Sequence, residues 1–362
     1  MTLLAPNYSD GSLVNLVAAI ERSLTGVSPS PPLSGGLLPE ADGWVVVLFD
    51  GLGAHQLGSP EARDLSASLA ARITAGFPTT TTTSMATIAT GHAPAHHGLI
   101  GHMLPFPGME EVVNVLKWVT PSGKPVEYDY SSVLPSPNLW ERLARAGIEP
   151  ITVQPGAFMG SPLSRLLYRG CRFEAAWKAD EIVEATVDLA RPGRLVFAYY
   201  PNVDVAAHVA GQDSEAYRQA LGEAARLWSD LARRLPGDVA LVGTADHGHL
   251  DYSAPDKVLI RDRRYDRLRF YGDPRSVYVD GPIETIEELA GETGAEVVGT
   301  GRLLEWLGGP PSHPSLDERL PDRLLLAPHG KVLLPRPFDK RLIGYHGGLE
   351  PEESEVPLLV RQ

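Results

Sequence analysis

The chain has 362 residues, more than a single hydrophobic core usually contains, which predicts one large domain with an insertion. Its hydrophobic content of 43% is ordinary for a globular protein. The net charge of −13 argues against nucleic acid polymers and anionic membranes as main partners. Cys171 is the only cysteine, which excludes an intramolecular disulfide bond and a metal site built from several cysteines.

Residues 1–20 lack the basic start and the compact apolar segment of a signal peptide. No apolar run approaches the roughly 20 residues that a membrane-spanning helix needs. We therefore expect a cytoplasmic protein that does not act at a membrane.

Apolar runs alternate with helix-like stretches along the chain, a pattern typical of an α/β fold whose mainly parallel sheet carries helices on both faces. The first of these runs, WVVVLF, leads directly to Asp50 and Gly51. An Asp-Gly pair after a strand is often only a turn. In a parallel sheet, however, ligands gather beyond the carboxyl ends of the strands, where Asp50 would lie.

A run of threonines follows in residues 77–84, FPTTTTTS, before the segment MATIATG. Threonine is poor in a helix interior but favourable at a helix N-terminus, where its hydroxyl satisfies a free backbone N–H. The segment MATIATG is then a short helix closed by Gly91. The threonines either cap this helix or supply a nucleophile, because the positive end of the helix dipole activates a hydroxyl there.

Three helices are predicted in the middle of the chain, over residues 138–146, 179–190 and 214–235. The apolar run before the last of them, LVFAYYPNV, leads to Asp204. His208 follows four residues later, so a helix starting there would place both side chains on one face. Such a pair either binds a metal ion or is an ordinary pair of hydrogen-bonded polar groups.

The run VALVGTA ends at Asp246 and His247, whose adjacent side chains could grip one ion only on an irregular turn beyond the strand. His249 and Asp251 come just after this turn, and we expect them behind the ligands rather than among them. Near the C-terminus, the run LIGY leads to His346 between glycines, where an ordinary surface loop is the alternative.

The composition of the sequence changes in residues 257–335, where charged segments alternate with predicted short helices and short strands. We interpret this segment as a small inserted α/β cap, and residues 1–256 and 336–362 as the metal-binding catalytic core. Five arginines between positions 261 and 269 could bind phosphate oxygens. They are interleaved with aspartates, however, which is more typical of a solvated face.

Six metal-type side chains are thus expected at one edge of the sheet: Asp50, Asp204, His208, Asp246, His247 and His346. Carboxylates and imidazoles beside a buried sheet need a polar partner or a metal ion. Three aspartates and three histidines suit two divalent ions with mixed nitrogen and oxygen ligands, which favours Zn²⁺ over Mg²⁺. Two such ions typically clamp the attacking and leaving oxygens of a displacement at phosphorus.

These motifs resemble those of the alkaline phosphatase superfamily, and within it the nucleotide pyrophosphatase/phosphodiesterase branch. The most specific pieces are FPTTTTTSMATIATGHAPAHHGLIGH, DVAAH, TADHG and GYHGGLEPEESEVPLLV. The resemblance implies a hydrolase that cleaves a phosphodiester, or a related phosphate or phosphonate bond, in a small-molecule substrate. It also implies a covalent phospho-threonine intermediate that is hydrolysed by water activated on a metal ion.

The resemblance further implies the role of each residue. One Zn²⁺ would be held by Asp204, His208 and His346, and the other by Asp50, Asp246 and His247. The nucleophile would be Thr81, because the catalytic threonine of the family lies ten residues before the glycine that closes the short helix, here Gly91. Thr80 and Thr82 are the alternative registers.

The sequence departs from the pattern of this branch at two places. His102 lies 21 residues after Thr81, where the branch usually has an asparagine that contacts a phosphate oxygen. A histidine can still donate a hydrogen bond, so we expect His102 at that oxygen. The aromatic residue and the asparagine that usually follow the nucleophile are replaced by Thr82 and Ser84, which leaves a nucleotide substrate without support from this motif.

Two alternative functions stay open, a phosphomonoesterase of the same superfamily and a metal-binding relative without turnover. Monoesterases must neutralise an extra charge on phosphate, commonly with an arginine or a third metal ion, and no such group is identifiable near the motifs. The intact ligand set and the available threonine favour an enzyme over a binding module. The sulfatase branch is disfavoured because it needs a cysteine or serine nucleophile.

Overall fold

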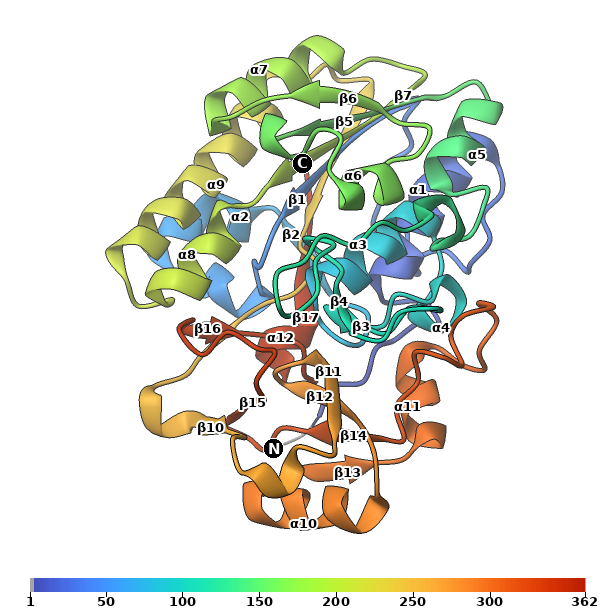
Figure 1. The fold of residues 1–362 in the computed structure, drawn as a ribbon. Helices are drawn as coiled ribbons and strands as arrows, with labels where there is room; N and C mark the ends of the chain where they lie inside the picture. The colour runs from blue at the N-terminus through green and yellow to red at the C-terminus, as the bar shows by residue number, and fades with distance from the viewer. Residues whose placement is uncertain (1–2, 362) are drawn as a thin grey trace.

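The computed structural model describes residues 3–361; residues 1, 2 and 362, at the ends of the predicted core, lie outside the described residues. A seven-stranded sheet forms the centre of the larger body, in the order β2-β17-β8-β1-β7-β5-β6 (Figure 1). Its strands are β1 Gly43–Phe49, β2 Leu69–Thr74, β5 Glu149–Gln154, β6 Arg172–Ala175, β7 Arg194–Tyr200, β8 Val239–Thr244 and β17 Glu355–Val360.

The sheet is mainly parallel, as the sequence predicts. β1 pairs in parallel with β7 and β8, and β5 pairs in parallel with β6 and β7. β17 runs antiparallel to both β2 and β8. Every residue of β1, β7 and β8 is buried, because these strands are covered on both faces and their sequences are nearly continuous apolar runs.

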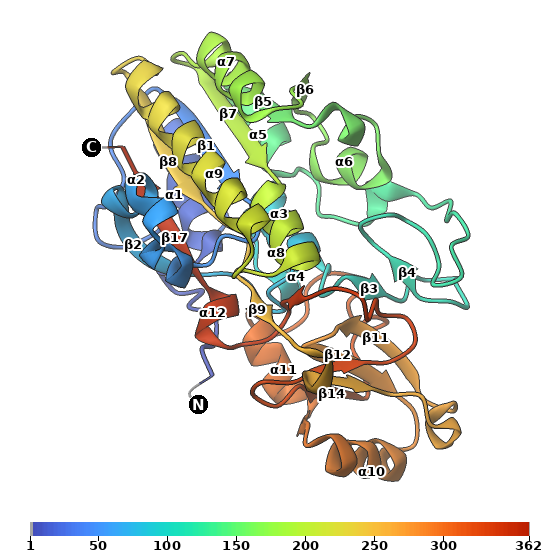
Figure 2. The same cartoon turned by 90° about the vertical axis from the view of Figure 1, so that its left-hand side faces the viewer.

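Helices cover both faces of this sheet (Figure 1 and Figure 2). The helices of the larger body are α1 Leu13–Thr25, α2 Arg63–Ala67, α3 Thr81–Thr90, α4 Pro94–His97, α5 Leu139–Arg145, α6 Pro162–Leu167, α7 Ala179–Leu189, α8 Asn202–Ala210, α9 Glu215–Arg234 and α12 Pro351–Ser354. α2, α7, α8 and α9 lie on one face, and α1, α3 and α5 on the other. The three helices predicted in the middle of the chain are confirmed as α5, α7 and α9.

The ends of these helices follow from capping residues. Asn138 precedes α5, and its side chain accepts a hydrogen bond from the backbone N–H of Glu141 while the carboxylate of Glu141 accepts from the N–H of Asn138. Ser214 caps α9 through a single hydrogen bond, which its hydroxyl accepts from the N–H of Tyr217. α9 then buries one face, which carries its alanines and leucines, against the sheet and the neighbouring helices.

Much of the segment 257–335 lies in a smaller body beside the large sheet, drawn in orange in Figure 1. Its antiparallel six-stranded sheet has the order β13-β14-β12-β11-β3-β4. The elements are β3 Met103–Leu104, β4 Val113–Asn114, β11 Arg269–Asp273, β12 Ser276–Asp280, β13 Glu296–Val298, β14 Arg323–Leu326, α10 Ile283–Thr293 and α11 Thr300–Leu307. Because β3 and β4 come from residues outside 257–335, the sheet joins both parts of the chain; the division at residues 257 and 335 stays a prediction.

Two pairs of short strands lie where the two bodies meet. They are β9 Leu250–Asp251 with β16 Gly344–Tyr345, and β10 Lys257–Leu259 with β15 Val332–Leu334. The short 3₁₀ helices are Ala54–Gly58, Pro60–Ala62, Tyr130–Ser132, Gly156–Phe158, Ala254–Asp256 and Arg263–Tyr265. β9 and β16 bring the segment after His247 beside the segment before His346.

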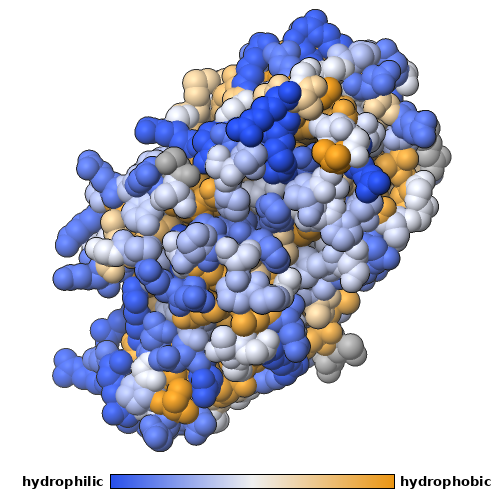
Figure 3. Space-filling model, turned by 90° about the vertical axis from the view of Figure 1, so that its right-hand side faces the viewer, coloured by the Kyte–Doolittle hydropathy of each residue, from blue (hydrophilic) through white to orange (hydrophobic). Residues whose placement is uncertain are grey.

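The face of the molecule drawn in Figure 3 is mainly hydrophilic, with apolar side chains in small separate groups. Such scattered apolar residues are normal on the surface of a globular protein. Among residues 3–361, no helix combines the length and the apolar character that crossing a membrane requires.

Candidate metal centre and active site

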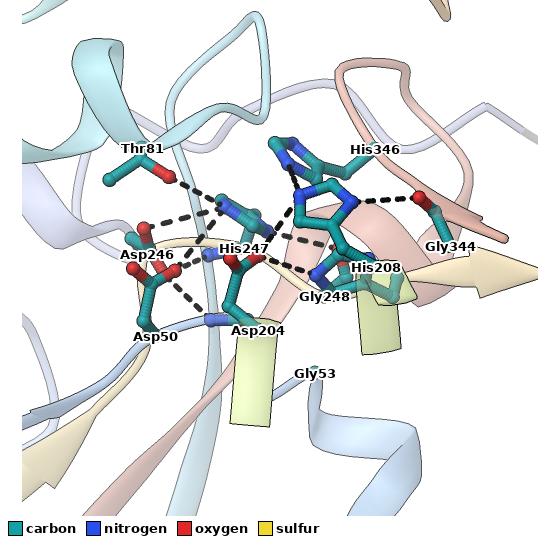
Figure 4. Close-up of polar contacts among 12 residues, drawn as sticks. Asp50, Gly53, Thr81, Asp204, His208, Asp246, His247, Gly248, Gly344 and His346 are labelled. Atoms are coloured by element: carbon teal, nitrogen blue, oxygen red, sulfur yellow. Dashed lines mark hydrogen bonds and ion pairs between the residues drawn. The ribbon is translucent and has the colours of Figure 1, made fainter. Parts of the chain in front are cut away.

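Three neighbouring strands deliver carboxylates to one edge of the large sheet (Figure 4). Asp50 follows β1, Asp246 follows β8, and Asp204 lies in the first turn of α8, directly after β7. Directly after Asp50 the chain turns at Gly51, whose φ is +73°. A Cβ atom there would lie 2.9 Å from the Cβ of Asp204, so this close approach requires glycine.

The carboxylates of Asp50 and Asp246 are buried and incompletely paired. The Oδ1 of Asp50 and the Oδ2 of Asp246 have no hydrogen-bond partner among the described residues. Their other oxygens accept hydrogen bonds, from the hydroxyl of Tyr199 and from the backbone N–H of Gly51 at 3.0 Å. Burial, together with the charges of Asp246 and Asp204, raises the pKa of Asp50 well above its ordinary value. Buried carboxylate oxygens in this arrangement fit a bound cation.

Two imidazoles face each other in the same site. The Nε2 atoms of His208 and His346 are 3.3 Å apart. The Nδ1 of His208 donates to the carbonyl of Gly344 at 2.8 Å, and the Nδ1 of His346 donates to the carbonyl of Thr79 at 2.7 Å. Since a carbonyl oxygen only accepts, each Nδ1 carries a proton, which leaves the two Nε2 atoms directed at each other. Two Nε2 atoms this close can share a bound cation, and a backbone partner at Nδ1 is usual for metal-binding histidines.

The ligand-type atoms fall into two groups, in each of which all atoms lie within 4.8 Å of one another. One group contains Asp204, His208, His249 and His346, and the other contains Asp50, Asp204 and His247. Asp246 lies beside the second group, with its Oδ2 3.4 Å from the Nε2 of His247. The structure therefore brings together all six metal-type side chains predicted from the sequence, and their nitrogen and oxygen atoms fit a divalent metal ion.

Two further residues of this site are not among those predicted from the sequence. His249 is buried, and its Nε2 lies 2.7 Å from the Oδ1 of Asp204, within the first group rather than behind it. Tyr199, at the end of β7, donates its hydroxyl to Asp50. The sequence places His249 two residues after His247 and Tyr199 in the run before Asp204. Neither position reveals which way the side chain points.

The threonine run forms the start of α3, as predicted. Thr80 is the N-cap, Thr81 is the first helical residue, and Gly91 ends the helix with a φ of +70°. The hydroxyl of Thr81 lies 3.2 Å from the Nε2 of His247, so it points toward the metal-type side chains (Figure 4).

The neighbouring hydroxyls have other environments. Thr79 donates to the carbonyl of Gly348 at 3.0 Å, Thr82 donates to the carbonyl of Gly101 at 2.9 Å, and the side chain of Thr80 bonds to Asp273. The hydroxyl of Thr83 is buried and has no partner in the described part of the chain. Thr81 alone in the run from 79 to 83 is partly exposed.

A cleft of about 360 Å³ opens beside these groups. Its lining includes Thr80, Thr81, His102, Asn114, Lys117, Asp204, His208, Asp273, Phe338, Asp339 and His346. His102 therefore shares the cleft with the hydroxyl of Thr81, and its contact with a phosphate oxygen stays a prediction. Burial, followed by the charges of His208 and Lys117, lowers the pKa of His102 to about 4, so its ring is neutral near pH 7.

Asp273 enters the cleft from the end of β11, in the inserted segment. Its Oδ2 accepts a hydrogen bond from the backbone N–H of His102 at 3.2 Å. Burial raises its pKa to about 7, although the hydrogen bonds from Thr80 and from His102 act in the opposite direction. Asp273 thus connects the inserted segment to Thr80, which precedes Thr81, and to His102. The local sequence, YGDPRS, is typical of a turn and does not predict this contact.

Comparison with known proteins agrees with these features. A sequence profile of the family described as type I phosphodiesterase / nucleotide pyrophosphatase matches residues 44–272, more than half of the chain. Ectonucleotide pyrophosphatase/phosphodiesterase 1 of Saccharomyces cerevisiae is 25% identical over 251 residues, which cover 58% of this chain and 32% of the yeast protein. The chain thus spans about a third of the length of this curated relative.

Solved structures show the same fold. Murine ectonucleotide pyrophosphatase / phosphodiesterase 5 superposes with a TM-score of 0.67 at 18% identity, over 87% of each chain. Phosphonoacetate hydrolase from Sinorhizobium meliloti 1021, in complex with phosphonoacetate, superposes with a TM-score of 0.65 at 18% identity, over 90% of this chain and 91% of the other. The chain therefore belongs to the type I phosphodiesterase / nucleotide pyrophosphatase family, the branch of the alkaline phosphatase superfamily that its motifs predict.

Proposed function

We propose that this protein is a two-metal hydrolase that cleaves a phosphodiester, or a related phosphate or phosphonate bond, through a phospho-threonine intermediate. The observation that carries the proposal is the convergence of the metal-type side chains and the hydroxyl of Thr81 on one cleft. Family membership supports hydrolysis of a phosphate ester. The phosphonate alternative is included because phosphonoacetate hydrolase shares the fold.

Each metal ion has its own proposed ligand set. Asp204, His208 and His346 would hold one divalent ion, and Asp50, Asp246 and His247 the other; Zn²⁺ suits these ligands best. His249 accompanies the first set through its contact with Asp204. When bound, the ions would offset the charge of the phosphoryl group and favour the ionised form of an oxygen nucleophile.

Thr81 is the proposed nucleophile. Its oxygen begins α3, where the partial positive charge of the helix N-terminus stabilises a developing alkoxide. The hydroxyl gives up its proton to solvent as its oxygen attacks phosphorus. A new O–P bond forms, and the bond to the leaving group breaks with the electron pair departing on that group. Water then attacks the phospho-threonine, which releases the product and restores the hydroxyl of Thr81.

His102 is proposed to stabilise a non-bridging oxygen of the phosphoryl group. Its ring is neutral and donates through one nitrogen, since the other accepts a hydrogen bond from the side chain of Asn114 at 3.1 Å. A donor placed where negative charge accumulates stabilises the transition state more than the bound substrate. We further propose that residues 257–335 form a cap subdomain, which contributes Asp273 to the cleft.

Metal removal and reconstitution test this proposal. Dialysis against a chelator should abolish hydrolysis of bis(4-nitrophenyl) phosphate, and Zn²⁺ should restore it better than Mg²⁺. Metal analysis should give two ions per chain, and fewer in the Asp50→Asn and His346→Ala variants. Asp213→Asn, which changes an exposed aspartate outside both sets, serves as the control and should keep full metal content. Undiminished turnover by metal-free protein would refute the proposal.

A further inference from the structure

The turn that follows β4 has an unusual backbone. Trp118 has a φ of +53°, and it is the only non-glycine residue with a positive φ among residues 3–361. A bulky side chain disfavours this conformation, which persists only where surrounding contacts hold it and which clusters at functional sites. The indole supplies those contacts, since it is buried against the rings of Phe106, Tyr128 and Tyr130, with centroid distances of 5.1, 6.0 and 4.7 Å.

Hydrogen bonds within the turn fix its two cleft-lining residues. The backbone N–H of Trp118 donates to the carbonyl of Asn114 at 2.7 Å, and the N–H of Lys117 donates to the Oδ1 of Asn114 at 3.0 Å. Because Oδ1 is the acceptor there, the amide nitrogen of Asn114 is the atom that faces the Nε2 of His102. The side chain of Asn114 therefore holds both the backbone of Lys117 and the ring of His102, so the turn fixes these residues relative to one another.

Lys117 brings a positive charge to the cleft and forms no ion pair with an acidic group among the described residues. Its side chain is exposed, and it is the only lysine or arginine in the described lining of the cleft. Asp339 lines the same cleft, and its charge interacts with that of Lys117. Both of its carboxylate oxygens, however, accept hydrogen bonds from Arg341, at 2.9 and 2.6 Å. Asp273 is buried and already accepts hydrogen bonds.

We propose that Lys117 forms an anion subsite of the cleft and that the preferred substrates carry a second negative charge close to the reacting phosphoryl group. This inference rests on the proposed hydrolase function and narrows its substrate class. The second charge has two possible sources, a further ionised oxygen on the phosphoryl group of a monoester, or an acidic group on the substituent that a diester retains. Either negative group would pair with the ammonium group of Lys117, next to the oxygen that accepts the hydrogen bond from His102.

Three chromogenic substrates with the same 4-nitrophenolate leaving group test the subsite. 4-Nitrophenyl methyl phosphate carries one negative charge, 4-nitrophenyl phosphate carries the second charge on the phosphoryl group, and 4-nitrophenyl 2-carboxyethyl phosphate carries it on the substituent. Lys117→Gln should lower kcat/KM about tenfold for one or both doubly charged substrates and change it less than about twofold for the methyl diester. The doubly charged substrate whose kcat/KM falls identifies the source of the second charge.

Controls separate a charge effect from a structural one. Lys117→Arg should retain most of the preference, and Lys124→Gln, which removes the same charge from an exposed site in the same loop, should retain all of it. Added salt should weaken the preference of the unaltered protein, because the subsite is exposed. Equal losses on all three substrates, or none on any, would overturn the anion subsite and leave the hydrolase standing. Failure of the unaltered protein to hydrolyse any of them with Zn²⁺ present would overturn both.

Discussion

At the scale of single residues, the hydroxyl of Thr81 differs from its neighbours in both exposure and partner. Thr81→Ala should lower kcat by about 100-fold or more, because covalent catalysis loses its acceptor. Thr81→Ser should keep part of the activity. Thr83→Val is the matched control, since it removes a hydroxyl that has no partner in the described structure. Steady-state kinetics with Zn²⁺ present measure these effects, and a large loss in Thr80→Ala with little in Thr81→Ala would place the nucleophile one residue earlier.

His102 provides a second prediction at this scale. His102→Ala should reduce kcat/KM by about 10- to 1,000-fold with unchanged metal content, because a hydrogen bond to the developing charge is lost. His102→Asn should recover part of the loss, as an amide can also donate. Kinetics combined with metal analysis check this. Unaltered kinetics in His102→Ala would remove the residue from the proposed mechanism.

Five of the metal-type residues were predictable from sequence because each follows a strand-like run or lies in a glycine-rich turn, and His208 because it lies one helical turn after Asp204. The edge of a parallel sheet then brings such positions together. Tyr199, Asp273 and Lys117 were not predictable in this way. Tyr199 lies inside a buried strand, where the sequence does not tell which neighbour its hydroxyl meets. Asp273 and Lys117 reach the cleft through contacts between segments far apart in the chain, which local patterns do not encode.

At the scale of elements, the connection from α3 to α4 depends on a neutral histidine. His97 is buried, and its Nδ1 accepts a hydrogen bond from the N–H of Leu99 at 3.2 Å, so its Nε2 donates to the hydroxyl of Thr87 at 3.1 Å. Burial, with the charges of His92 and His313, lowers the pKa of His97 well below its usual 6.5. A proton added to Nδ1 would oppose the N–H of Leu99.

Stability should therefore fall in acid. The unfolded chain binds a proton at the histidine below about pH 6.5 while the folded chain does not, so this contribution is complete above about pH 6.5 and is lost as the pH falls toward the folded pKa. Urea unfolding near pH 7.5 and near pH 5 should show the decrease. The decrease should be smaller in His97→Gln, which cannot titrate there. Identical pH dependence in both proteins would contradict this account.

The three helices in the middle of the chain, α5, α7 and α9, were predictable to within a residue or two because capping residues and amphipathic spacing are local. Asn138 and Ser214, the predicted first residues of two helices, cap α5 and α9. β3 and β4 were not predictable, because each has only two residues and no alternation of apolar and polar positions can develop. Their pairing with the inserted segment is a tertiary property of the fold.

At the scale of the whole molecule, Arg275 links the inserted segment to the loop that carries His346. It is 1% exposed, and it forms ion pairs with Glu350 at 2.5 Å and Glu353 at 3.3 Å. The Oε1 of Glu353 also accepts a hydrogen bond from the N–H of Gly348 at 3.0 Å. The position of this loop therefore depends on a guanidinium supplied from the turn between β11 and β12.

Arg275→Met should lower the free energy of unfolding by about 3–5 kcal/mol, because Glu353 and Glu350 would stay buried without the guanidinium that pairs with both. Denaturant unfolding measures the change. Arg264→Met is the control: this arginine contacts three acidic groups, but all four side chains are about half exposed, so its loss should matter far less. Equal effects of the two substitutions would show that burial does not set the strength of these pairs.

The six-stranded sheet contains strands from residues 257–335 and from residues 103–114, which limits how the segment 257–335 can be separated from this protein or replaced. β11 is hydrogen-bonded to β12 on one side and to β3 on the other. A fragment containing residues 257–335 alone would leave that second edge of β11 open, and an open strand edge invites pairing between molecules. A cap transplanted from a relative would meet the same problem unless the hairpin of β3 and β4 moved with it. Changes in the cap and in the hairpin are thus expected to be coupled, although the two lie far apart in the sequence.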